Sequence, residues 1–300
     1  MTIAVTDSGL GGLSTAASLI RRLRAACPFR AAHVVYFNAH AADGVGYNDL
    51  QSTDTKAALF ERALRSLHLR CQPDHVLVAC NTLSVLLNQT SYGAGSSSPA
   101  VGIVDAAMRS ILAYLKHRPD CAVLLFATPT TVSSGVYQER LSQAGVATQR
   151  VGVVSCPRLH SLVEHNPTSE VIHSIVYNHV VDGLTQVTPL FHHAVAASLN
   201  CTHYGYVADV FRAGLQANRV VSPAVLNPNG AMVDFLFENT GTGKRCEVSV
   251  EVISQVPIES QQQRQLGALL GSVSPELAHA LRNYSLEKGL FEWRDLCVES

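Results

Sequence analysis

Residues 3–23 have the sequence IAVTDSGLGGLSTAASLIRRL, and this stretch sets the expected fold. Residues 3–6 form an apolar run with the length of a buried strand, and residues 9–12 are rich in glycine. Apolar residues then recur with the helical period at Leu13, Ala16, Ala17, Ile20 and Leu23, before Pro28. A strand that leads through a glycine loop into an amphipathic helix is typical of a parallel α/β sheet.

Six further short apolar runs are expected to form strands. They lie at residues 33–37, 75–80, 100–104, 122–127, 151–154 and 194–200. Helical patterns separate these runs, and one of them passes through Ala57, Phe60, Leu64 and Leu67, with Asp54 as its expected N-cap. The alternation predicts the α/β class, with mainly parallel sheets flanked by helices on both faces.

The chain has the pattern of a duplicated α/β unit. The same offset of 121 residues (128 minus 7, and 201 minus 80) separates Asp7 from Thr128 and Cys80 from Cys201, all at expected strand ends. A Gly/Ser-rich stretch at residues 92–99 predicts a flexible linker. We therefore expect two pseudo-symmetric domains, one of residues 1–97 plus 209–300 and the other of residues 98–208. Because ligands of open α/β sheets bind beyond the carboxyl ends of the strands, the active site is expected in the cleft between the domains.

The composition argues against several classes of protein. The 22 Lys and Arg residues and 23 Asp and Glu residues give a net charge of −1, whereas a nucleic-acid surface needs clustered basic residues. No apolar run approaches the roughly 18 residues of a membrane span, and no targeting segment is expected. The 8 cysteines are scattered, so neither a disulfide framework nor a structural zinc site is expected. We predict a cytoplasmic enzyme with reduced thiols and with no nucleic-acid or membrane partner.

Two of these cysteines have similar surroundings. Cys80 and Cys201 each end an apolar run and each precede two hydrogen-bonding residues, Asn-Thr after the first and Thr-His after the second. A helix N-terminus is expected after each, where backbone N–H groups favour a thiolate and a substrate carboxylate. The other six cysteines are expected to be inert apolar fillers. Cys201 and His203 are alternatively two ligands of a metal, but further ligands have no obvious source.

Asp7 and Ser8 end the first strand, directly before glycines that let the backbone approach a ligand. The loop matches neither G-x-G-x-x-G nor G-K-[ST], so a nucleotide site is poorly supported. The alternative is a purely structural role, in which Asp7 only caps the following helix.

Five segments, in order along the chain, resemble the aspartate/glutamate racemase superfamily, and its glutamate branch most closely. Residues 7–13 are similar to the opening D-S-G-x-G-G-L, and residues 79–82 (ACNT) to the first catalytic motif. Residues 128–137 are similar to T-x-x-T-V-x-S-x-x-Y, residues 156–164 to C-P-x-x-x-x-L-V-E, and residues 201–204 (CTHY) to the second catalytic motif. The His after Cys-Thr favours the glutamate branch over the aspartate branch.

The resemblance implies cofactor-independent racemisation of L-glutamate to D-glutamate, which would supply peptidoglycan synthesis. Two cysteines on opposite walls would act as the two bases, with no pyridoxal phosphate and no metal. Asp7 would assist Cys80, while His203 and Glu164 would assist Cys201. The expected substrate-binding residues are Asp7, Ser8, Tyr47, Asn48, Asn81, Thr82, Thr128, Thr131, Thr202 and His203.

Three segments depart from the family pattern. Its Y-F-G-D corresponds here to residues 36–39 (YFNA), its P-Y-G to residues 46–48 (GYN), and a later acidic D-S pair to residues 227–229 (NPN). These changes touch the side of the site that would hold the substrate side-chain carboxylate. The alternatives are therefore a racemase of another substrate, such as aspartate or a hydantoin, or a racemase-like protein that binds without catalysis.

Residues 260–300 lie outside these motifs. Their apolar residues indicate amphipathic helices through Leu266, Leu269 and Leu270, and then through Leu277, Leu281 and Leu286. These helices would pack either on the first half of the chain or at a homodimer contact.

Overall fold

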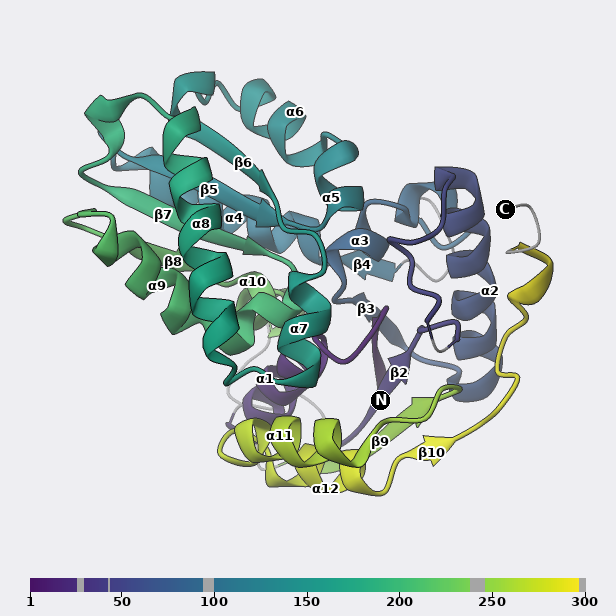
Figure 1. The fold of residues 1–300 in the computed structure, drawn as a ribbon. Helices are drawn as coiled ribbons and strands as arrows, with labels where there is room; N and C mark the ends of the chain where they lie inside the picture. The colour runs from purple at the N-terminus through teal and green to yellow at the C-terminus, as the bar shows by residue number, and fades with distance from the viewer. Residues whose placement is uncertain (26–29, 43, 94–99, 238–245, 297–300) are drawn as a thin grey trace.

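Two parallel β-sheets organise the chain in the computed structural model, which describes residues 1–25, 30–42, 44–93, 100–237 and 246–296 (Figure 1). The first sheet has the order β10-β9-β2-β1-β3-β4 and the second the order β6-β5-β7-β8. The strands of the first sheet are β1 Thr2–Asp7, β2 Ala31–Asn38, β3 His75–Val78, β4 Ala100–Gly102, β9 Glu247–Ser254 and β10 Ser285–Leu286. Those of the second are β5 Ala122–Ala127, β6 Val151–Ser155, β7 Val195–Asn200 and β8 Ala224–Leu226.

Helices connect the strands and cover both sheets (Figure 1). In the first half and its C-terminal continuation they are α1 Leu13–Ala25, α2 Thr53–Cys71, α3 Asn81–Ser84, α10 Pro228–Ala231, α11 Ser260–Gly271 and α12 Pro275–Arg282. Around the second sheet they are α4 Ile103–Lys116, α5 Pro129–Ser133, α6 Val136–Gln143, α7 Leu159–His165, α8 Glu170–Gln186 and α9 Ala208–Ala217. Short 3₁₀ helices lie at Leu87–Gln89, Thr148–Arg150, Pro189–Phe191, Thr202–Val207, Asp234–Phe237 and Arg294–Leu296.

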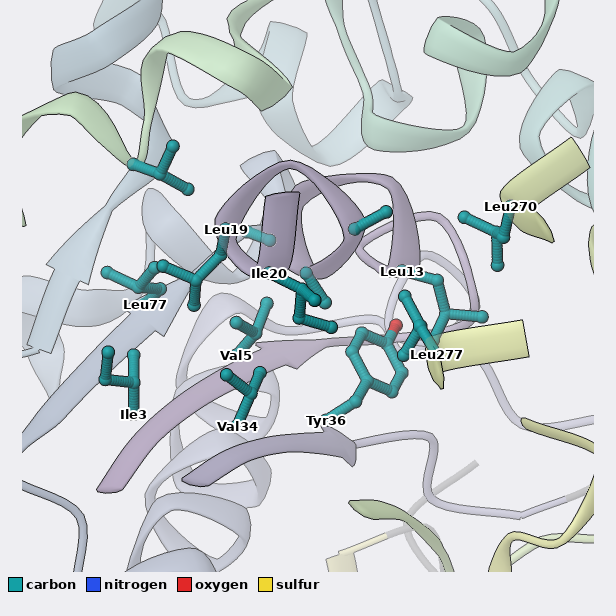
Figure 2. Close-up of a cluster of buried hydrophobic side chains, with 14 of the residues drawn as sticks. Ile3, Val5, Leu13, Leu19, Ile20, Val34, Tyr36, Leu77, Leu270 and Leu277 are labelled. Atoms are coloured by element: carbon teal, nitrogen blue, oxygen red, sulfur yellow. The ribbon is translucent and has the colours of Figure 1, made fainter. Parts of the chain in front are cut away.

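Alternate residues of each strand pack into different cores, which explains the continuous apolar runs. In β1, Ile3 and Val5 join the core beneath α1, α11 and α12, while Ala4 joins the core beneath α2. Figure 2 shows the first of these cores, with ten labelled side chains: Ile3, Val5, Leu13, Leu19, Ile20, Val34, Tyr36, Leu77, Leu270 and Leu277. The second sheet is covered in the same way by α7, α8 and α9 on one face and by α4 and α6 on the other.

The sheets share one internal arrangement. The order β2-β1-β3-β4 in the first corresponds to β6-β5-β7-β8 in the second, and every strand pair in the described part of the chain is parallel. The predicted α/β class with mainly parallel sheets is confirmed. Cys80 follows β3 and Cys201 follows β7, the corresponding neighbours of β1 and β5.

Sheet membership differs in two places from the predicted domain division. β4 lies in residues 98–208 but pairs with β3 of the first sheet, and β8 lies in residues 209–300 but pairs with β7 of the second. Each is a three-residue strand at a sheet edge, too short for its apolar pattern to indicate a partner. The division into two domains stays a proposal, with these strands assigned by their sheets.

Several element boundaries also differ from the prediction. β3 ends at Val78 and β4 ends at Gly102, where α4 begins. Ser52, not Asp54, caps α2: its hydroxyl accepts a hydrogen bond from the N–H of Thr55 at 2.9 Å. β8, β9 and β10 were not predicted. β9 alternates valine with polar residues instead of forming a continuous apolar run, since its first half is only partly buried.

The C-terminal helices pack on the first half. α11 and α12 contribute Leu266, Leu270, Leu277 and Leu281 to the core beneath α1, whereas Leu286 lies in β10. Of the predicted linker, residues 94–99 lie outside the described residues, as does Pro28. Cys71 and Cys246 are half-buried rather than buried as expected, and Cys27 and Cys297 lie outside the described residues. Among the described helices none is long and apolar enough to cross a membrane.

Candidate active site

The carboxyl ends of four strands, two from each sheet, meet at one small cavity of about 20 Å³. β1 and β3 bring Asp7 and Cys80 to it, while β5 and β7 bring Thr128 and Cys201. The complete lining is Asp7, Ser8, Asn48, Cys80, Asn81, Thr82, Thr128, His160, Cys201, Thr202 and His203. Ten of the thirteen predicted site residues are therefore brought together. The other three, Tyr47, Thr131 and Glu164, stand behind this lining.

Both cysteines cap a helical turn. Cys80 is the N-cap of α3, and Cys201 is the N-cap of the 3₁₀ helix Thr202–Val207. The predicted helix start after each cysteine is thus present. Each cysteine is 6% exposed, so both thiols lie in a nearly dry environment.

The surroundings of Cys80 favour the protonated form of its thiol. Burial raises the pKa of Cys80, and the nearby Asp7 carboxyl raises this pKa further. The Sγ atom of Cys80 lies 3.2 Å from the hydroxyl oxygen of Ser8, in hydrogen-bond contact. Cys80 is therefore suited to giving a proton rather than to taking one as the site stands.

Cys201 has a chain of partners that Cys80 lacks. Its Sγ lies 3.8 Å from Nδ1 of His203, and Nε2 of His203 lies 2.5 Å from Oε2 of Glu164. Burial opposes the charged imidazolium, but the hydrogen bonds to Cys201 and Glu164 outweigh it and raise the pKa of His203 well above its ordinary value. Burial likewise opposes the Glu164 carboxylate, but the hydrogen bond with His203 lowers the pKa of Glu164 to about 2.

Asp7 joins the two halves of the site. Its carboxyl accepts a hydrogen bond from the N–H of Gly9 at 3.1 Å and another from the hydroxyl of Thr202 at 2.8 Å. Burial raises the pKa of Asp7, while the His203 charge and the Thr202 hydrogen bond lower it in part. Asp7 has no exposed surface, so it can hold or exchange a proton out of contact with bulk water.

Hydroxyls and amides line the wall between the cysteines. The hydroxyl oxygens of Thr82 and Thr128 lie 2.9 Å apart, and those of Thr128 and Thr131 lie 3.1 Å apart. The hydroxyl of Tyr137 donates to Oδ1 of Asn81 at 2.6 Å, which leaves Nδ2 of Asn81 without a partner among the described residues. The network holds Asn81 and Thr82 in place and leaves donors available for an anionic group.

A larger cavity of about 290 Å³ adjoins the small one. The two share the lining residues Ser8, Asn48, His160 and His203. Tyr47 and Glu164 line only the larger one, which explains their absence from the inner lining. Within the described residues, no group of three His, Cys, Asp or Glu side chains is arranged to hold a metal, so the alternative role of Cys201 and His203 has no third ligand.

Comparison with known proteins places this geometry in a family. Residues 8–187 match the family model of Asp/Glu/hydantoin racemases. This chain belongs to the Asp/Glu/hydantoin racemase family. It is 31% identical over 244 residues to the glutamate racemase of Dinoroseobacter shibae, covering 75% of this chain and 81% of the relative. It is 28% identical over 202 residues to that of Syntrophus aciditrophicus, covering 67% of each.

Solved structures share the fold of this racemase. The glutamate racemase of Campylobacter jejuni aligns with a TM-score of 0.67 at 24% identity, over 90% of this chain and 98% of that one. One from Bacillus anthracis aligns with a TM-score of 0.69 at 19% identity, over 90% and 94%. The predicted family and fold are confirmed, as is the prediction of an amino-acid racemase, so the alternative of a protein that only binds is set aside.

Glycines of the first loop allow the two halves of the racemase to approach closely. A Cβ on Gly11 would lie 2.4 Å from Oγ1 of Thr202 and 2.8 Å from the backbone nitrogen of His203. A Cβ on Gly9 would lie 2.7 Å from Oε2 of Glu164. A Cβ atom cannot approach other heavy atoms this closely. The loop therefore needs glycine at these positions, because Thr202, His203 and Glu164 pack directly against its backbone.

Replacing Gly11 with alanine should therefore push the loop away from Thr202 and His203. We expect racemisation to fall about 100-fold, the typical cost of moving a catalytic group by about 1 Å. Overpacking should lower the free energy of unfolding by about 1–3 kcal/mol. Steady-state kinetics and thermal unfolding check both. Gly267→Ala is the control, because the nearest heavy atom to its Cβ would be 3.8 Å away. Equal behaviour of the two variants would contradict the close-approach argument.

The racemase also uses residues that the motifs did not indicate. Nδ2 of Asn229 donates to the backbone carbonyl of Thr202 at 2.9 Å, so the departing segment 227–229 supports the second cysteine loop. Asn38, from another departing segment, donates to Ser254 at 3.0 Å and lines the larger cavity. His160 lies inside C-P-x-x-x-x-L-V-E, at a position that this motif leaves open. Asn38 and Asn229 are marked in the sequence only as parts of segments that depart from the family pattern, and His160 is not marked at all, so the fold alone shows that these side chains lie at the site.

Proposed function

We propose that this racemase interconverts L- and D-glutamate without a cofactor, with Cys80 and Cys201 as its two proton-transfer groups. The observation that carries the proposal is that both cysteines, from corresponding positions after β3 and β7, line one small cavity. The names of the relatives, all glutamate racemases among those cited above, support glutamate as the substrate.

In the proposed reaction a thiolate removes the α-proton on one face of the substrate and a thiol on the other face protonates the carbanion. We assign the role of the base to Cys201, because Nδ1 of His203 lies 3.8 Å from its Sγ and can exchange a proton with it. Cys80 is the thiol, since burial and Asp7 raise its pKa. After one turnover Cys201 carries the proton and Cys80 is the thiolate, so the enzyme is ready for the opposite direction. Positioned proton-transfer groups contribute about 10²–10⁴-fold each.

The remaining predicted residues would hold the charged groups of the substrate. Asn81, Thr82 and Thr202 have donors at the inner cavity and would bind the α-carboxylate. Asp7 would orient the α-ammonium group, and Thr128 and Thr131 would support Thr82. Ser8, Tyr47 and Asn48 lie toward the larger cavity and would contact the side chain of the substrate. A D-glutamate product would serve peptidoglycan synthesis.

The direct test follows purified enzyme with each enantiomer of glutamate in D₂O. We expect both enantiomers to form, with deuterium at the α-carbon, at a rate unaffected by chelator and without added cofactor. Chiral chromatography and mass spectrometry measure the products. A wild-type enzyme that leaves the α-proton of glutamate in place would overturn the proposal.

The altered segments favour one second candidate, a racemase of a different acidic substrate. The side-chain amide of Asn38 donates to Ser254 and accepts from the N–H of His40, so both of its polar atoms already have partners within the protein. The same exchange assay with aspartate and with a hydantoin separates this candidate from glutamate. Exchange of one of these substrates at a higher kcat/KM than glutamate would establish it.

A further inference from the structure

His160 stands where the two cavities meet. It lies on α7, lines both the small cavity and the larger one, and its ring centroid is 6.0 Å from that of His203. Its Nδ1 atom is buried and has no hydrogen-bond partner among the described residues. Two other buried polar atoms in the lining of the larger cavity also lack a hydrogen-bond partner among the described residues: Oδ1 of Asn48 and the hydroxyl of Tyr47. A group entering from the cysteines toward the larger cavity would meet these three side chains.

The lining of both cavities contains no lysine and no arginine among the described residues. A second carboxylate on a substrate would therefore need another partner. Lys56 follows the cavity residues Tyr47 and Asn48 closely in the sequence. Its Nζ, however, donates to Thr130 at 2.8 Å, and it lines neither cavity.

The other histidines of these cavities are engaged by the protein. A ring nitrogen of His40 contacts the carbonyl of Ala42 at 2.8 Å, and one of His165 contacts the carbonyl of Ser161 at 2.9 Å. His203 is held between Cys201 and Glu164. His160 is thus the cavity histidine whose buried nitrogen is left for a ligand, within the part of the chain that the structure describes.

We propose that the imidazole of His160 binds the side-chain carboxylate of the substrate and so sets specificity for an acidic amino acid. The proposal rests on the proposed function and adds to it a residue that the motifs leave open. His160 acts in binding, not in proton transfer, because it lines both cavities while Cys201 already has His203 as its partner.

The charge state of His160 gives the contact a pH signature. Burial and the charge of His203 lower the pKa of His160 to about 4, and His40 acts in the same sense, while Glu164 and Asp49 act in the opposite one. The free side chain is therefore neutral at pH 7. A bound carboxylate stabilises the imidazolium and raises this pKa, so binding takes up a proton. Affinity should accordingly increase as the pH falls from 7 to 5.5.

The experiment compares wild type with His160→Ala and His160→Asn, whose amide replaces the hydrogen-bonding group at Nδ1. KM and kcat for glutamate are measured from pH 5.5 to 8, and D-glutamate binding is measured by calorimetry. We expect His160→Ala to raise KM and Kd about 10-fold at pH 7, with kcat within about 3-fold, and the KM ratio to wild type to grow as the pH falls. His160→Asn should recover part of the affinity at pH 7.

Three results would overturn the proposal: KM and Kd of His160→Ala within twofold of wild type, a loss confined to kcat, or a KM ratio that does not change with pH. His173→Ala is the matched control and should leave KM unchanged, because His173 is an exposed histidine on α8 that lines neither cavity. Thermal unfolding verifies that the variants fold. If His160→Ala does not fold, His160→Asn still tests the proposal. A wild type that binds glutamate without exchanging its α-proton refutes the proposed function alone, since the calorimetry still tests His160.

Discussion

Replacing Cys80 or Cys201 with serine should lower the rate of glutamate racemisation at least about 10³-fold. A serine hydroxyl is a far weaker acid than a thiol, so it neither forms the needed anion nor returns the proton at a useful rate. The expected size follows from the 10²–10⁴-fold contribution of one positioned acid or base. The two variants should differ in the enantiomer whose α-proton they still exchange, because each retains the thiol of one wall only.

Deuterium incorporation into L- and D-glutamate, measured separately, checks this prediction. Cys71→Ser is the control, since Cys71 is a half-buried thiol at the end of α2 and lines neither cavity. It should retain wild-type kinetics. Full racemisation by both single variants of Cys80 and Cys201 would refute the two-base mechanism. Loss of exchange in the Cys71 variant would point to a general effect on folding instead.

Replacing Glu164 with glutamine should lower kcat about 10- to 100-fold. Without the carboxylate, the buried imidazolium of His203 loses its charged partner, and leaving a buried charge unpaired costs about 3–5 kcal/mol. The pKa of His203 should fall, so the ring would no longer place a positive charge beside Cys201. Glutamine keeps an oxygen that can accept from the N–H of Leu10, as Glu164 does at 2.9 Å, so the backbone contact is retained.

The same substitution has a pH signature in stability. The His203 pKa is raised, so its contribution is complete below its ordinary value of 6.5 and is lost as the pH rises through the folded value. The Glu164 pKa is lowered to about 2, so its contribution is complete above its ordinary value of 4.5 and is lost as the pH falls. The difference in unfolding free energy between wild type and Glu164→Gln should therefore be largest between about pH 4.5 and 6.5.

Denaturant unfolding across pH 3–9 measures that difference. Glu170→Gln, an exposed residue at the start of α8, is the matched control and should show no such window. A stability difference that does not vary with pH would mean that Glu164 and His203 are not a charged pair. A kcat equal to wild type would show that the pair does not serve Cys201.

Much of the fold followed from local patterns, and the exceptions have physical causes. The buried central strands β1, β5 and β7 were predicted because both of their faces are apolar. β8 and β10 were missed because two or three residues carry no periodicity, and β9 because it is only partly buried along its first half. The sheet membership of β4 and β8 depends on strand pairing across the chain, which no local pattern encodes.

For the candidate site, too, some features followed from the sequence and others required the fold. Cys80 and Cys201 were singled out by strand ends and by the polar residues that follow them. The contact of Asp7 with Thr202, 195 residues away, and that of Glu164 with Leu10, 154 residues away, required the fold. His160 lies at an open position of its motif and Asn229 in a segment that departs from the family pattern, so only their contacts assign them to the site.

The sequence by itself determined the α/β class, the pairing of strand-end cysteines and the family, because these depend on periodicity and on short contiguous motifs. The tertiary structure alone decided the contacts around these cysteines, since His203 and Glu164 become partners only when α7 packs against the turn after β7. It also decided the direction of the pKa shifts of Cys80 and His203, because these shifts depend on burial and on charges that lie close in three dimensions but far apart in sequence.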